Sequence, residues 1–130
     1  ISLNWIGQNR MDILVDMGSE AAVRYIVPNL QQLESLPVRG LIVTGLAESL
    51  PYHFVSRCFY PRVGVNEDPV TGSAHCCLAA YWAQKLNKTK LLAYQASKRG
   101  GEIGLTLMPN NRVLLQGQAV ITLQGQAFIE

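Results

Sequence analysis

The feature that most constrains the fold is a long apolar run from Ala74 to Leu86, which overlaps the end of the polar stretch Asn66–His75. A helix over Ala74–Leu86 would be apolar on nearly every face, so it must be enclosed by protein or by lipid. The run is too short to span a bilayer, which takes about 20 residues. We therefore expect a helix that the rest of the chain encloses.

Two short helices are expected before this run. Ser19 is a suitable N-cap, and Glu20 is favourable near the positive end of the helix dipole. Pro28 is well placed as the first residue of a second short helix, which Pro37 then ends.

The other apolar segments have the composition or the alternation of β-strands. After the long helix they are separated by turn-forming residues at 99–101, 109–111 and 124–126, a spacing that predicts an antiparallel meander. A sheet curled around the helix is the simplest way to bury it. The predicted fold is therefore α+β, an antiparallel β-barrel or curled sheet wrapped around one central apolar helix, in a single domain over residues 1–130. The expected strands are Met11–Met17, Val38–Thr44, Phe54–Tyr60, Leu91–Ser97, Glu102–Met108, Arg112–Leu115 with a continuation to Leu123, and Ala127–Ile129.

Composition excludes several classes of protein. The chain has 130 residues, of which 48% are hydrophobic, and a net charge of +2, as expected for a packed globule. Its Lys and Arg residues are scattered, so nucleic acid is not an expected partner. Since the apolar run is too short to span a bilayer, a membrane is not an expected partner either. The odd number of cysteines, with Cys76 and Cys77 adjacent, favours a reducing compartment, and we expect a cytoplasmic location. No metal-ligand spacing or nucleotide-binding loop is present, so no metal or cofactor is predicted.

The chain begins with Ile1 rather than Met, which is consistent with a processed or truncated piece of a longer protein.

The stretch from Asp68 to His75 is the candidate functional site. Thr71, Gly72 and Ser73 place a glycine between two hydroxyls at a helix N-terminus, where free N–H groups and the helix dipole favour a carboxylate or a phosphate. His75 is close enough to act as an acid or base, and its unperturbed pKa lies near neutrality. Two structural alternatives remain open: Asp68 as a helix cap only, and His75 as a core residue bonded to a strand carbonyl.

Two segments together resemble the phenazine biosynthesis PhzF-like family, which includes animal phenazine-biosynthesis-like-domain proteins. They are Glu67–His75 and Gln95–Glu102, and the likeness extends from Asp12 to the end of the chain. It covers the C-terminal half of such a protein. The resemblance implies a diaminopimelate epimerase-like fold, in which two similar lobes each wrap a β-barrel around a central helix and the active site lies between them.

The resemblance also implies an activity, a cofactor-independent isomerisation that moves a proton on carbon in a small carboxylate-bearing substrate. A glutamate of the N-terminal lobe would be the principal acid/base. Asp68 would then be the catalytic residue here, as an orienting carboxylate or secondary acid/base. Thr71, Gly72, Ser73 and His75 are the candidate substrate-binding residues, with Gly72 and Ser73 as donors to a substrate carboxylate.

The expected protein partner is the N-terminal lobe or a second copy of the chain. Residues 1–130 alone would provide half a cleft, so we expect little or no turnover from them. The alternative is a non-catalytic protein-interaction domain on the same fold. A third interpretation is a carboxylate-binding module without chemistry.

Overall fold

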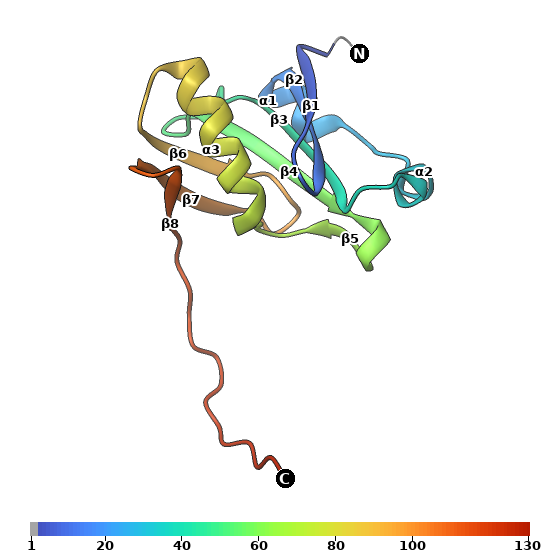
Figure 1. The fold of residues 1–130 in the computed structure, drawn as a ribbon, viewed down its shortest axis with the longest axis vertical. Helices are drawn as coiled ribbons and strands as arrows, with labels where there is room; N and C mark the ends of the chain where they lie inside the picture. Colours follow the sequence, from blue (N-terminus) through green and yellow to red (C-terminus); the bar gives the residue numbers. More distant parts are fainter. Residues whose placement is uncertain (1–2) are drawn as a thin grey trace.

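The computed structural model describes residues 3–130 as one eight-stranded sheet with a helical layer on each face (Figure 1). Hydrogen-bonded neighbours follow the order β1-β2-β3-β4-β6-β7-β8, and β5 pairs with β4 off this path. The elements are β1 (Trp5–Gln8), β2 (Asp12–Ser19), α1 (Glu20–Tyr25), α2 (Leu30–Ser35), β3 (Gly40–Leu46), β4 (Phe54–Tyr60), the 3-10 helix η1 (Pro61–Val63), β5 (Val65–Asp68), α3 (Gly72–Leu86), β6 (Lys90–Gln95), β7 (Gly101–Met108) and β8 (Arg112–Gln116).

The expectation was an antiparallel β-barrel or curled sheet, but the sheet is mixed in strand direction and is not closed into a barrel. β2 pairs with β3 in parallel, and β4 pairs with β6 in parallel. Parallel neighbours need a crossover connection, which α1 and α2 provide for the first pair and α3 for the second. β1 and β8 do not pair with each other, so they remain the two edges of the sheet. The α+β class is confirmed, but the barrel is not.

The middle of the sheet is buried on both faces. Leu14, Ile42 and Phe54 belong to the core cluster that includes α3. The next residue in each strand, Val15, Val43 or Val55, belongs to a second cluster around Val23 of α1. Since successive strand residues point to opposite faces, the three strands separate two helical layers.

Helix α3 lies on the sheet, and its side chains contact residues of β2, β3 and β4. The indole N–H of Trp82 donates to the Thr44 hydroxyl at 2.9 Å, and the Trp82 ring stacks on Phe54 with centroids 5.4 Å apart. Tyr81 and Lys85 both reach the buried carboxylate of Asp16 in β2. On its other side α3 contacts β6, β7 and β8.

The expectation that α3 is enclosed on every side was wrong. Cys76 and Ala80 are exposed, because the open sheet leaves one stripe of the helix uncovered. Its buried residues are Ala74, His75, Leu78, Ala79, Trp82 and Ala83. In the described part of the chain, no helix combines the length and the apolar character needed to cross a membrane.

The two short helices follow the expected pattern with one correction. The Ser19 side chain accepts from the Ala22 amide at 3.2 Å, which confirms Ser19 as the N-cap of α1. Pro28 is not the first residue of α2, since the helix begins at Leu30. The Asn29 side chain caps it by accepting from the Gln32 amide at 3.0 Å, and this fixes the start of the helix.

The C-terminal segment differs most from the predicted strands. Residues 117–130 form no helix or strand and are exposed, and Figure 1 shows them running away from the folded body. The predicted continuation to Leu123 and the predicted strand Ala127–Ile129 were therefore wrong. A strand needs a neighbour for its backbone hydrogen bonds, and the described residues offer this segment none.

Candidate active site

Asp68 is the last residue of β5, a short strand that the sequence does not predict. Its backbone lies opposite Cys58 of β4, and its side chain is half-buried. The Thr71 hydroxyl donates to Asp68 Oδ2 at 2.5 Å. Among residues 3–130, no hydrogen bond reaches Asp68 Oδ1. One carboxylate oxygen is therefore held by Thr71, and the other has no hydrogen-bond partner among these residues.

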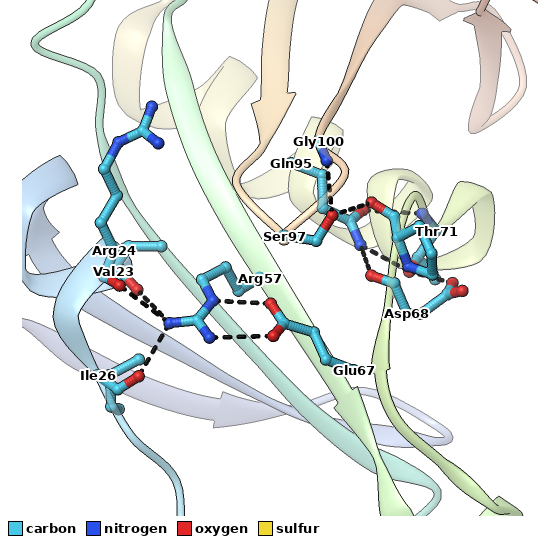
Figure 2. Close-up of polar contacts among 11 residues, drawn as sticks. Val23, Arg24, Ile26, Arg57, Glu67, Asp68, Thr71, Gln95, Ser97 and Gly100 are labelled. Carbon is cyan, nitrogen blue, oxygen red and sulfur yellow. Dashed lines mark hydrogen bonds and ion pairs between the residues drawn. The ribbon is translucent and has the colours of Figure 1, made fainter.

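Gln95, fully buried at the end of β6, clamps the turn between Asp68 and Thr71 (Figure 2). Its Nε2 donates to the Asp68 carbonyl at 2.8 Å and to Thr71 Oγ1 at 3.0 Å, and its Oε1 accepts from the Thr71 amide at 2.8 Å. Because the Thr71 hydroxyl accepts from Gln95, its own proton is directed to Asp68. The amide of Gln95 thus sets the direction in which the Asp68 carboxylate is held.

The loop at residues 96–100, between β6 and β7, is bonded to the same turn. The Ser97 hydroxyl donates to the Pro69 carbonyl at 2.8 Å and accepts from the Gly100 amide at 3.0 Å (Figure 2). Gly100 has φ +73°, and a Cβ there would lie 2.0 Å from the Tyr94 hydroxyl oxygen, so the turn requires glycine. The predicted turn is thereby confirmed at Arg99 and Gly100, although Gly101 already belongs to β7, and the loop is bonded to Pro69, the residue after Asp68.

Arg57 of β4 holds the residue before Asp68 from the opposite side (Figure 2). Its Nε and Nη2 donate to the two carboxylate oxygens of Glu67 at 2.7 and 3.0 Å. A bidentate pair of this kind is both strong and directional. Nη1 donates to carbonyls at the end of α1, namely Val23 at 3.2 Å, Arg24 at 3.1 Å and Ile26 at 2.8 Å. One guanidinium therefore connects α1 to β5.

The N-terminus of α3 opens beside a cavity of about 690 Å³, lined by residues that include Gly72, Arg99, Gly101 and Leu115. The N-cap residue, Thr71, makes no side-chain cap bond, so the first-turn N–H groups are left for a ligand or solvent. A Cβ at Gly72 would make ordinary contact with Leu115 at 3.6 Å, so packing within the chain does not demand glycine there. Space, free donors and the helix dipole together suit an anionic group.

The predicted site residues fall into two groups. Gly72 and Ser73 are exposed at the mouth of α3, and Gly72 lines the cavity. Asp68, Thr71, Ser73 and His75 do not line it, and Thr71 is buried with its hydroxyl and amide already engaged. The observed contacts of Thr71 are therefore with Asp68 and Gln95, and its part in substrate binding stays a prediction.

His75 is fully buried, with Nδ1 donating to the Thr71 carbonyl at 2.7 Å. Burial lowers the pKa of His75 to about 4, although its bond to the Thr71 carbonyl raises it, so the ring is neutral at physiological pH. The geometry favours the interpretation of His75 as a core residue over a substrate ligand.

Sequence reasoning missed a further residue at the mouth. Arg39, which directly precedes β3, donates from Nη2 to the Ser73 hydroxyl at 3.1 Å while it binds the buried carboxylate of Asp12. Arg39 precedes Ser73 by 34 residues, and no local pattern marks it. Arg57 and the clamping role of Gln95 were missed for the same reason, since their partners are distant in the sequence.

Residues 3–125 match the family model described as phenazine biosynthesis-like protein, PhzC-PhzF. The chain belongs to this phenazine biosynthesis-like family. It is 52% identical over 125 residues, 96% of its length, to an uncharacterized isomerase of Halalkalibacterium halodurans, of which the match covers 47%. It is 48% identical over 102 residues, 75% of its length, to the human phenazine biosynthesis-like domain-containing protein, of which the match covers 35%.

A crystal structure from the same family has the same fold. The phenazine biosynthesis protein PhzF family structure from Enterococcus faecalis superposes with a TM-score of 0.87 at 38% identity, covering 98% of this chain and 48% of that one. Family membership and the family fold are thus established for the chain. The chain spans half or less of the length of these relatives.

Proposed function

We propose that the chain forms one lobe of a cofactor-independent isomerase that moves a proton on carbon in a small carboxylate-bearing substrate. Family membership and the isomerase names of two relatives, from Halalkalibacterium halodurans and Pseudomonas aeruginosa, support this class of reaction. The observation that carries it is the Asp68 carboxylate, with one oxygen fixed by Thr71 and the other unengaged, four residues before the open N-terminus of α3.

In this reaction one C–H bond breaks and another forms, so the product has the composition of the substrate. A base removes the proton, the electron pair shifts through the neighbouring double bond, and an acid returns a proton at a second carbon. Asp68 Oδ1 would orient the substrate or take part in the second transfer. The N–H groups of Gly72 and Ser73 would hold the substrate carboxylate at the mouth of α3.

The principal acid/base would come from a second lobe facing this one, supplied by the remaining part of a longer protein or by a second copy of the chain. Two exposed apolar surfaces support such a partner. One is the α3 stripe at Cys76 and Ala80, and the other is the C-terminal segment, where Val120, Ile121, Leu123, Phe128 and Ile129 are exposed. Exposed apolar side chains that lie close together in one segment are typical of a protein interface.

The same surfaces favour one alternative, a protein-interaction domain that keeps the fold without catalysis. Extended apolar segments can bind a partner by adding a strand to its sheet. In this alternative Asp68 would serve only the turn before α3. The two functions differ in whether a small carboxylate is bound and altered at the α3 mouth.

Deuterium incorporation tests the proposal across a whole class of candidate substrates. A panel of small unsaturated and α-substituted carboxylic acids would be incubated in D₂O with residues 1–130 joined to the complementary half of the Halalkalibacterium relative. Mass spectrometry would detect deuterium on carbon. We expect exchange with the joined protein and a decrease of about 100-fold or more in Asp68→Asn. Glu34→Gln makes the same chemical change on an exposed residue of α2, and it should leave the rate unaltered.

The outcomes separate the candidate functions. Equal exchange in folded Asp68→Asn and the parent would contradict the role of Asp68. Robust exchange by residues 1–130 in monomeric form would contradict the need for a second lobe. Stable capture of a protein partner, with no carboxylic acid bound or exchanged, would favour the interaction domain.

A further inference from the structure

Arg39 is held in place by a buried carboxylate. Asp12, at the start of β2, is fully buried, and its backbone lies opposite Gly40 at the start of β3. Arg39 Nε donates to Asp12 Oδ1 at 2.9 Å, and Nη2 donates to Oδ2. A buried carboxylate is costly unless it is paired, so the fold itself requires a cation at this point.

The guanidinium of Arg39 is also fixed in orientation. It lies over the ring of Tyr60, with its carbon 4.9 Å from the ring centroid. The two bonds to Asp12 and the ring beneath leave little freedom, and 28% of the Arg39 side chain remains exposed. From this position Nη2 also donates to the Ser73 hydroxyl at 3.1 Å.

This contact determines what the Ser73 hydroxyl can do. A guanidinium only donates hydrogen bonds, so Ser73 Oγ accepts from Arg39, and its own proton must point elsewhere. Among residues 3–130, no acceptor takes that proton. Ser73 is exposed in the first turn of α3, so the hydroxyl and the first-turn N–H groups are available at the same surface.

We propose that Arg39 is a positioning residue that turns the Ser73 hydroxyl into a fixed donor for a carboxylate oxygen of the substrate. The inference rests on the proposed function and adds a residue and a recognition mechanism to it. The positive charge of Arg39 strengthens the Ser73 hydroxyl as a donor, and the Asp12 pair prevents the guanidinium from leaving. Selectivity for an anionic over a neutral group follows from this arrangement.

The test is a titration of the 130-residue chain with succinate, followed through the amide NMR signals of Gly72 and Ser73. Ser73→Ala keeps the Asp12–Arg39 pair and should weaken succinate binding about tenfold. Arg39→Lys keeps a cation for Asp12 but lacks the planar fork, and it should weaken binding by a similar factor. The double variant should bind no more weakly than the weaker single variant, because one change removes the Ser73 donor and the other removes only the group that positions it.

Controls separate positioning from a loss of structure. Arg112→Met removes an exposed arginine of β8 and should leave succinate binding unaltered. Asp12→Asn combined with Arg39→Gln replaces the buried ion pair by two amides and should fold while binding succinate as weakly as Ser73→Ala. Succinamide, which carries no charge, should bind equally poorly to all variants.

Three outcomes would overturn the inference. They are additive losses in the double variant, full succinate affinity in a folded Arg39→Lys chain, and no succinate binding by the parent chain. Deuterium exchange is a separate measurement. Failure of Asp68→Asn to reduce exchange would overturn the proposed function and leave the Arg39–Ser73 coupling in succinate binding intact.

Discussion

The two halves of the sheet are built differently. β2, β3 and β4 are buried on both faces, because α3 covers one face and α1 with α2 covers the other. β6 and β7 alternate between buried and less buried residues, and β8 is mostly exposed. The first half therefore has three layers, whereas the second half has α3 on one face and is open on much of the other.

The candidate site lies where these halves meet. β4 and β6 pair in parallel at three positions, the last being Ser56 opposite Gln95. Asp68 belongs to the first half through β5, yet Gln95 of the second half fixes its carbonyl and the Thr71 hydroxyl. The comparison indicates that the second half, through Gln95, positions the Asp68 carboxylate. The first half, with its three layers, supplies the rigid support for the strand that carries Asp68.

The largest expected effect concerns the core shared by α3 and the first half. Trp82→Ala removes a ring that is 1% exposed and stacked on Phe54, and it should lower the free energy of unfolding by about 3–5 kcal/mol. Leu114→Ala in β8, where the side chain is 48% exposed, should cost no more than about 1 kcal/mol. Urea unfolding measures both values. Similar costs at the two positions would contradict the difference between the halves.

A titration of stability against pH should reveal the lowered pKa of the buried His75 side chain. Burial lowers its pKa from the usual 6.5 to about 4, against the opposing effect of the Thr71 carbonyl. In the unfolded chain His75 therefore binds a proton below about pH 6.5, whereas in the folded chain it binds one only below about pH 4. The free energy of unfolding should fall by about 3 kcal/mol as the pH drops from 6.5 to 4. His75→Gln should flatten this dependence, and an unchanged slope in that variant would place the ring in contact with solvent.

Arg57 tests whether the first half supports the segment that carries Asp68. Arg57→Met leaves Glu67 and three carbonyls of the α1 end without their donor, and it should cost about 2 kcal/mol of stability. Hydrogen exchange of the amides at 65–71 should become faster as well. Arg112→Met in β8 is the matched change, with an expected effect within about 0.5 kcal/mol. An equal effect of the two substitutions would contradict the view that the first half supports the segment that carries Asp68.

The smallest expected effect is a difference in cysteine reactivity between the core and the exposed side of α3. Cys58 is fully buried, and burial raises its pKa to about 12, so it should resist alkylation in the folded protein. Cys76 is exposed and should react first with iodoacetamide. Peptide mass mapping measures the order of labelling. Modification of Cys58 before Cys76 without denaturant would show that the first half opens.

Local sequence patterns predicted what local physics decides. The bounds of β4, Phe54–Tyr60, are those expected, and Ser19 caps α1 as predicted. The helix at Ala74–Leu86 was also found, with its first turn beginning at Gly72. Each of these signals depends on residues within a few positions of one another, such as a proline, a cap or an apolar run.

Local sequence patterns could not predict the pairing between strands that are distant in the sequence. The parallel β2–β3 and β4–β6 pairs depend on how α1, α2 and α3 cross the sheet. Residues 117–130 have strand-like composition, but composition does not provide a neighbouring strand. The site shows the same limit, because the motif around Asp68 was evident, whereas Arg39, directly before β3, lies 34 residues before its partner Ser73.

The bond between Trp82 and Thr44 gives the chain an internal optical probe. Of its two tryptophans, Trp82 is buried in the core with its indole N–H bonded to Thr44, whereas Trp5 is 45% exposed beside Tyr81. Their fluorescence should therefore differ, with Trp82 emitting at shorter wavelength. A Trp5→Phe variant would isolate the buried emitter. A red shift would then report separation of α3 from the sheet, and with it the opening of the support beneath Asp68.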